Sequence, residues 1–248
     1  MSIWAIGDLH LSFGCHGKEM DVFGPEWHRH HEKIQAFWDS HVHSDDLVLI
    51  PGDISWAMRL DEAKPDLAWI DARPGTKVMI KGNHDHWWAS ASKVRAMLPP
   101  SLHIIWNDAF QWGDVSVGGS RLWETDALDF SAVIEMKPKP PGIKEAEAHN
   151  PQDDKKIFDR ELLRLEASLK AMRKDAPLKI VMTHFPPIGW DMRESAAVPL
   201  IEGVGAHHVV FGHLHSVRRG ILLFGTKAGI PYDLVSADWL QFTLFKVS

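Results

Sequence analysis

Five short apolar runs in this 248-residue sequence each end in a polar motif, and this repeated pairing constrains the fold most. An apolar run of about four to eight residues bounded by glycine or proline is typical of a strand buried on both faces. Such strands belong to parallel sheets, and the carboxyl ends of parallel strands share one edge. We therefore expect all five motifs to meet at one edge. The runs cover residues 3–6, 47–50, 77–80, 178–182 and 207–211, and they lead into Gly7-Asp8-Leu9-His10, Gly52-Asp53, Gly82-Asn83-His84-Asp85, Thr183-His184 and Gly212-His213-Leu214-His215.

Segments with helical periodicity separate these runs. The pattern predicts helices over residues 27–39, 61–71, 87–97, 154–175 and 196–203, and an antiparallel set of strands over 220–247. The helix at 154–175 is the most regular, because apolar residues recur at steps of three and four, at Phe158, Leu162, Leu165, Leu169 and Met172. Strands that alternate with helices in this way predict an α/β fold.

We expect one domain over residues 1–248, with an irregular excursion at about 124–156. The sequence Lys137-Pro138-Lys139-Pro140-Pro141 excludes regular structure within that excursion. The chain has no signal-peptide pattern and no apolar run of membrane length, so we expect a cytoplasmic protein without a membrane partner. A single cysteine, Cys15, excludes an internal disulfide and a cysteine-based zinc site. The oligomeric state stays open.

The motif residues carry the chemistry of a metal centre. Carboxylate, imidazole and amide groups without any thiolate suit Mn, Fe, Zn or Ni ions, and the sequence leaves the choice among them open. Seven donors are too many for one ion with an open position, but they suit two divalent ions that share one carboxylate. Glycines placed just before the polar groups allow the backbone to turn sharply there. The seven candidate ligands are Asp8, His10, Asp53, Asn83, His184, His213 and His215.

With these motifs in this order, the chain resembles the calcineurin-like metallophosphoesterases from residue 7 to residue 215. The resemblance implies a four-layer αββα sandwich of two packed mixed β-sheets flanked by helices. It also implies that Asp53 bridges the two metals, that His84 faces the substrate without binding metal, and that Asp85 orients His84. The first metal would be held by Asp8, His10, Asp53 and His215, and the second by Asp53, Asn83, His184 and His213.

Three positions depart from patterns common in this family. Asp53 is followed by Ile54-Ser55-Trp56 without a second aspartate, Lys81 stands where protein Ser/Thr phosphatases have arginine, and Asp85 stands where they have glutamate. The chain therefore resembles the bacterial small-molecule and nucleotide esterases of the family more than its protein phosphatases.

The resemblance implies a phosphoesterase in which a hydroxide bridging two metals attacks phosphorus and His84 assists the leaving oxygen. A small phosphodiester or a nucleotide is slightly favoured as the substrate. A DNA nuclease of the same family and a non-catalytic metal-binding scaffold are the alternatives. The formal net charge of −6, from 27 basic and 33 acidic side chains, argues against a nucleic-acid partner, because such binding needs an excess of Lys and Arg.

Other polar and aromatic residues receive weaker interpretations. The tract Trp27-His28-Arg29-His30-His31 looks like a metal-binding segment but is read as a solvated helix face. Trp87 and Trp88 are predicted to pack in the core, and the alternative is that they form a wall of the substrate cleft. Three basic side chains could reach a phosphate, although the sequence does not place them: Arg121, Lys137 and Arg193.

Overall fold

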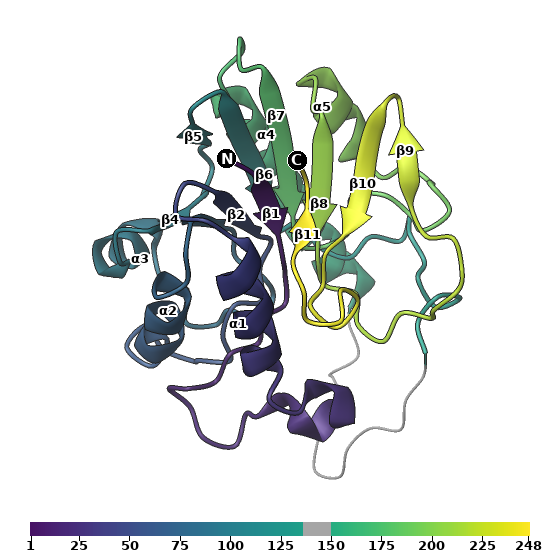
Figure 1. The fold of residues 1–248 in the computed structure, drawn as a ribbon. Helices are drawn as coiled ribbons and strands as arrows, with labels where there is room; N and C mark the ends of the chain where they lie inside the picture. Colours follow the sequence, from purple (N-terminus) through teal and green to yellow (C-terminus); the bar gives the residue numbers. More distant parts are fainter. Residues whose placement is uncertain (136–149) are drawn as a thin grey trace.

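The computed structural model describes residues 1–135 and 150–248 and shows two mixed sheets packed face to face (Figure 1). The proline-rich segment 137–141, including Lys137, lies outside the described residues, as do all of residues 136–149 of the expected excursion. In the first sheet, four parallel strands follow the order β1 (Ile3–Ala5), β2 (Leu47–Ile50), β3 (Thr76–Met79) and β4 (Leu102–Ile104). The strand β11 (Phe245–Lys246) pairs antiparallel with β1 at one edge.

The second sheet has six strands. Its parallel centre runs in the order β6 (Val115–Ser120), β7 (Leu178–Thr183), β8 (His208–Phe211) and β10 (Ile230–Leu234). The short strands β5 (Phe110–Trp112) and β9 (Gly225–Lys227) pair antiparallel at its two edges.

Side-chain alternation along the strands explains the layered architecture. Leu47 and Leu49 of β2 pack between the two sheets, while Val48 and Ile50 face the helices. Because a strand points successive side chains to opposite faces, a strand apolar on both faces must be covered on both. The predicted four-layer αββα sandwich is therefore confirmed.

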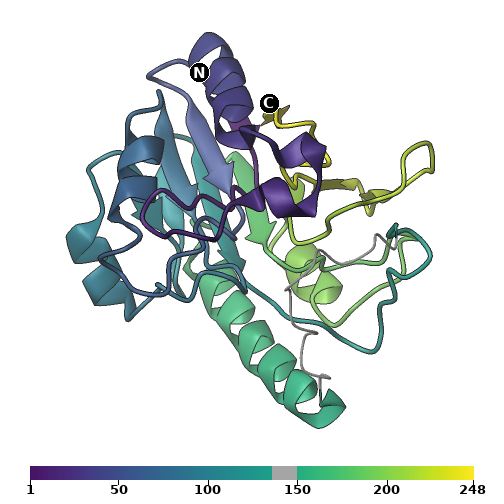
Figure 2. The same ribbon diagram turned by 90° about the horizontal axis from the view of Figure 1, so that it is seen from below.

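Helices cover the outer face of each sheet, as Figure 2 shows from below. The outer core of the first sheet is built with residues of α1 (His30–His41), α2 (Lys64–Asp71) and α3 (Ala91–Met97). The outer core of the second sheet is built with α4 (Pro151–Ala171) and α5 (Val198–Gly203). Two 3-10 turns, η1 (Met20–Phe23) and η2 (Pro25–Trp27), interrupt the loop after β1. Among the described residues, no helix combines the length and apolar character that a bilayer crossing requires.

Two predicted elements differ from the structure. The tract at 27–31 is not one solvated face: Arg29 adopts a left-handed conformation before α1, and His30 is buried, with its Nε2 2.9 Å from the Leu9 carbonyl. The strands after residue 220 are not one antiparallel set, because β10 pairs parallel with β8 and β11 joins the other sheet. Both differences arise from long-range packing that local periodicity does not report.

The helix α4 buries more than the predicted apolar stripe. Glu161 and Ser168 lie on its buried face, each nearly or fully inaccessible to solvent. The Ser168 hydroxyl donates to the Asp108 carbonyl at 2.6 Å and accepts from the Gly119 amide at 2.8 Å. These polar contacts fix α4 against the end of β6, beside the edge where the motifs gather.

Candidate metal centre

All seven candidate ligands lie together at the carboxyl edge of the two sheets. Asp8 and His10 follow β1, Asp53 follows β2 and Asn83 follows β3, so the first sheet supplies four of them. The second sheet supplies the other three, His184 after β7 and His213 and His215 after β8. The centre therefore exists only where both sheets meet.

The side chains form two groups that Asp53 joins. In one group, the Nε2 atoms of His10 and His215 lie 3.1 Å apart, and His215 Nε2 lies 3.5 Å from Asp8 Oδ1. Asp53 Oδ2 lies 3.6 Å from His10 Nε2.

In the other group, Asn83 Oδ1 lies 2.6 Å from His184 Nε2 and 3.1 Å from His213 Nδ1. The same Asp53 Oδ2 lies 3.4 Å from His184 Nε2. One carboxylate oxygen thus faces both groups, which is the arrangement that a shared ligand requires.

The chemistry of this donor set fits divalent cations. Asp8 and Asp53 are almost completely buried, and a buried carboxylate is costly unless a cation or donor compensates its charge. Clusters of three donor atoms within 4.8 Å of one another occur at Asp8, His10 and His215, and at Asp8, Asp53 and His184. Burial holds the pKa of both His10 and His213 well below the usual range, so these rings stay neutral, and neutral imidazole is the form that binds metal.

Outer contacts orient two of the histidines. The Nδ1 of His184 lies 2.9 Å from the Pro51 carbonyl, so Nδ1 carries the proton and Nε2 turns its lone pair to the centre. The Nδ1 of His215 lies 2.9 Å from Asp238 Oδ1 in the same manner. Although burial opposes charge on His215, Asp238 and Asp8 together outweigh it and raise the pKa of this ring. Asp238 was not predicted, because it follows β10 in a loop with no motif around it.

Backbone conformation at this edge is unusual for residues with side chains. Asp8, His10, Asp53 and His213 all have positive φ values between 45° and 73°. Such conformations are unfavourable for non-glycine residues and cluster at functional sites. The predicted role of the preceding glycines is confirmed for Gly52, whose φ is 93°.

Gly212 is required for a steric reason, and not because its backbone makes a sharp turn. A methyl group on its Cα would overlap the Asp8 carboxylate. We expect Gly212→Ala to displace Asp8 and to lower metal binding and turnover together by about 100-fold, since displacements near 1 Å can cost that much. The matched control is Gly203→Ala at the end of α5, where an added methyl group meets no atom within 4 Å. Metal content and turnover of the two variants test the prediction, and equal values would contradict it.

Asp85 holds the loops together. Its Oδ1 accepts from the amides of Ile54 and Ser55 and from Trp87 Nε1, and its Oδ2 accepts from the Gly82 amide, at 2.8–3.1 Å. None of its hydrogen bonds within the described part of the chain reaches the His84 ring. The orienting role that the family resemblance implies for Asp85 is therefore indirect in this geometry.

The His84 ring lies among other aromatic rings at the centre. Its amide donates to Asp53 Oδ1 at 2.8 Å, and its ring centroid lies 4.5 Å from that of Trp56 and 5.6 Å from that of His10. Burial lowers the pKa of His84, so the ring is neutral near pH 7. The Trp56 ring also stacks on the His10 ring, with their centroids 5.0 Å apart. Trp56 was not among the predicted site residues, because only tertiary packing brings it to the site.

A buried acid supports the segment that carries Asp53. The Asp66 carboxylate accepts from the Ser55 hydroxyl and, at 2.7 Å, from the Phe13 amide. Burial is the main cause that raises the pKa of Asp66 from 3.8 to about 6. The folded chain thus holds this proton more tightly than the unfolded chain. The resulting stability is complete below pH 3.8 and is lost as the pH rises through about 6.

We expect Asp66→Asn to remove this pH dependence while it keeps the shape of the side chain. Between about pH 3.5 and 7, the free energy of unfolding of the original protein should fall by about 3 kcal/mol relative to the variant. Denaturant unfolding of both proteins across this range provides the measurement. Parallel stability curves would show that Asp66 does not titrate as described.

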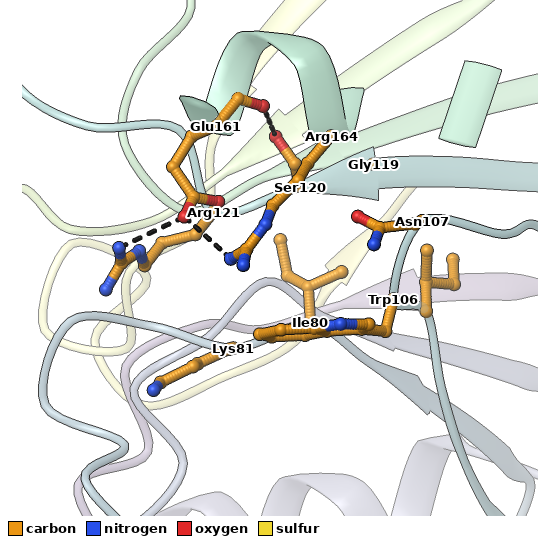
Figure 3. Close-up of a pocket in the computed structure, with 10 residues that line it drawn as sticks. Ile80, Lys81, Trp106, Asn107, Gly119, Ser120, Arg121, Glu161 and Arg164 are labelled. Atoms are coloured by element: carbon orange, nitrogen blue, oxygen red, sulfur yellow. Dashed lines mark hydrogen bonds and ion pairs between the residues drawn. The ribbon is translucent and has the colours of Figure 1, made fainter. Parts of the chain in front are cut away.

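Two of the predicted phosphate-binding cations are already paired. Arg121 follows β6, and its Nη2 lies 3.2 Å from Glu161 Oε1, which also accepts from Arg164 at 2.9 Å (Figure 3). Arg193 pairs with Asp191 at 3.5 Å on the surface. The small cavity that Figure 3 shows, about 20 Å³, has room for about one water molecule. Arg121, Glu161 and Arg164 form an ion cluster at its wall.

Comparison with known proteins identifies the family of this chain. The calcineurin-like phosphoesterase family matches residues 1–217. The Gene 66 proteins of Mycobacterium phages D29 and L5 are 36% and 37% identical over 87 and 84 residues, which make up 34% and 33% of this chain. The chain spans only 40% and 39% of the length of those two relatives.

One solved structure also shares the fold. A phosphopantetheinyl hydrolase from Mycobacterium tuberculosis is 15% identical, with a TM-score of 0.53 over 99% of this chain and 95% of that one. A protein of unknown function from Aquifex aeolicus is 12% identical, with a TM-score of 0.47 over 99% and 95% of the two chains.

Proposed function

Because this chain belongs to the calcineurin-like phosphoesterase family, whose members hydrolyse phosphoesters with the help of metal ions, we propose that it uses two divalent ions to hydrolyse a small phosphodiester or a nucleotide. The observation that carries this proposal is the position of Asp53 Oδ2, within 3.6 Å of His10 and 3.4 Å of His184. A single carboxylate in reach of both donor groups supports a centre with two ions.

The residues divide the work as follows. Asp8, His10 and His215 would hold one ion, Asn83, His184 and His213 would hold the other, and Asp53 would contribute to both. Divalent ions at such a site supply polarisation of the phosphoryl oxygens and a lowered pKa for water. The neutral amide of Asn83 adds no negative charge, which favours the approach of an anionic substrate.

His84 acts on the leaving group in this proposal. Its ring is partly exposed and packs against Trp56, whose contact limits how the imidazole can turn. Because the ring is neutral near pH 7, it carries one N–H that can donate a hydrogen bond to the leaving oxygen. Asp53 positions this residue through the hydrogen bond from the His84 amide.

Removal of metal tests the proposal. We expect dialysis against a chelator to abolish hydrolysis of bis-p-nitrophenyl phosphate and added Mn²⁺ to restore it, with two ions bound per chain by elemental analysis. Circular dichroism controls for folding. Turnover that survives complete removal of metal would contradict the proposal. Two bound ions without turnover of diesters, monoesters, cyclic nucleotides or single-stranded DNA would favour the scaffold, and preference for DNA would favour the nuclease.

A further inference from the structure

A cavity of about 280 Å³ opens directly beside His213. Phe185, which follows His184 after β7, lines this cavity, and its ring centroid lies 3.8 Å from that of His213. The cavity thus shares a wall with the candidate metal centre. Its volume is close to the lower end of small-molecule sites, about 300 Å³. An ester whose phosphorus lies at the centre can therefore place an organic group here.

Three aromatic side chains form the walls of the cavity, and neighbouring polar side chains hold Trp123 in place. Trp123, Phe130 and Phe185 line the cavity, and the rings of Trp123 and Phe185 lie 4.8 Å apart. Trp123 Nε1 donates to Asp154 Oδ1 at 2.9 Å. The guanidinium of Arg121 lies 4.5 Å from the Trp123 ring centroid.

The ion cluster of Figure 3 supports that stacked arginine. Glu161 is only 1% exposed and holds Arg121 through its Oε1. A wall braced in this way exists before any ligand arrives. Preformed walls reduce the conformational entropy that binding would otherwise cost.

The rim of the cavity is acidic. Glu124 and Asp129 line it and are exposed, and none of the described residues that line it is Lys or Arg. Carboxylates accept hydrogen bonds from N–H and O–H groups and repel a further phosphate. The lining therefore favours an uncharged group with hydrogen-bond donors and disfavours a polyphosphate or a nucleic-acid strand.

From these features, and resting on the proposed function, we propose that the cavity binds the nucleoside part of a nucleotide ester that carries a single phosphate. The planar base lies against Trp123 and Phe130, and hydroxyl or amino groups of the nucleoside face Glu124 and Asp129. Stacking on aromatic side chains tolerates different bases, because every base has a π-face. The cavity is then a determinant of substrate choice, and the metal centre supplies the chemistry.

Two esters with the same leaving group test this inference. We expect kcat/KM for the p-nitrophenyl ester of thymidine 5′-phosphate to exceed that for p-nitrophenyl methyl phosphate by about tenfold or more. Phe130→Ala should lower this ratio by about tenfold. Leu163→Ala, which truncates an apolar side chain that is 66% exposed on α4, should leave the ratio as it is. A ratio that is the same in Phe130→Ala and the original protein would overturn the inference.

A binding measurement separates this inference from the proposed function. Calorimetry with thymidine alone, on the full chain after chelation, should show saturable binding that Phe130→Ala weakens about fivefold or more. If thymidine bound in this way but neither ester were hydrolysed, the nucleoside site would be supported and the proposed function would be wrong. If both esters were hydrolysed but thymidine did not bind, the proposed function would stand and the inference that the cavity binds a nucleoside would be overturned. Absence of both would overturn both.

Discussion

Replacement of Asp53 by alanine is expected to remove most of the bound metal and the phosphoesterase activity together. Its Oδ2 atom faces both donor groups, at 3.6 Å from His10 and 3.4 Å from His184, so both proposed ions would lose a ligand at once. A catalytic ion contributes several kcal/mol of charge stabilisation, which corresponds to a loss of about 10³-fold or more in turnover. Elemental analysis and hydrolysis of bis-p-nitrophenyl phosphate measure the two effects.

A second variant separates loss of metal from loss of folding. Asp53 Oδ1 accepts the His84 amide, and alanine removes that contact as well. Asp53→Asn keeps an acceptor of the same shape but lacks the negative charge, so it should fold and still bind little metal. Asp175→Ala, at a carboxylate that is 89% exposed, serves as the surface control. If the folded Asp53→Asn protein kept two ions and full turnover, Asp53 would not be the shared ligand.

Replacement of His84 by alanine is expected to slow turnover by about 10²–10⁴-fold while both ions stay bound. The ring belongs to neither donor group, and it lies beside Trp56 at the partly exposed side of the centre. The loss should be larger for alkyl esters than for p-nitrophenyl esters, because a poor leaving group depends more on a hydrogen-bond donor.

His86→Ala offers a matched control in the same loop. The His86 ring is exposed, and its centroid lies 6.4 Å from that of His84. We expect this variant to keep both its metal and its turnover. If His84→Ala were fully active with its metal bound, or equally impaired for every leaving group, His84 would have no role at the leaving oxygen.

Local patterns in the sequence predicted the central strands and the edge at which the polar motifs meet. The apolar runs at 3–6, 47–50 and 178–182 correspond to β1, β2 and β7, and the polar motif after each lies at the predicted edge. Glycine and proline end β1 and β2 locally, and the carboxyl ends of parallel strands share one edge whichever segments lie between them. For that reason the seven candidate ligands were predicted to converge, and the structure brings them together.

The contacts that refine the site could not be predicted in the same way. Asp238 reaches His215 and Trp56 covers His10, yet no local pattern marks Asp238 or Trp56. Asp85 stands in a predicted motif, but its contacts with the Ile54 and Ser55 amides were not predicted. Glu161 lies on a helix face that periodicity assigned to apolar residues. Each of these contacts depends on how close two distant segments approach.

The sequence by itself therefore determined the order of strands and helices, the sharp turn at Gly52 and the residue types available for metal. Only the tertiary structure decided that β10 lies beside β8 and β11 beside β1, that one oxygen of Asp53 faces both donor groups, and that an aromatic cavity opens beside His213. The physical reason is that hydrophobic periodicity and backbone preferences act only between residues that are close in the sequence. Side-chain packing, burial and electrostatics act between segments that folding alone brings within a few ångströms.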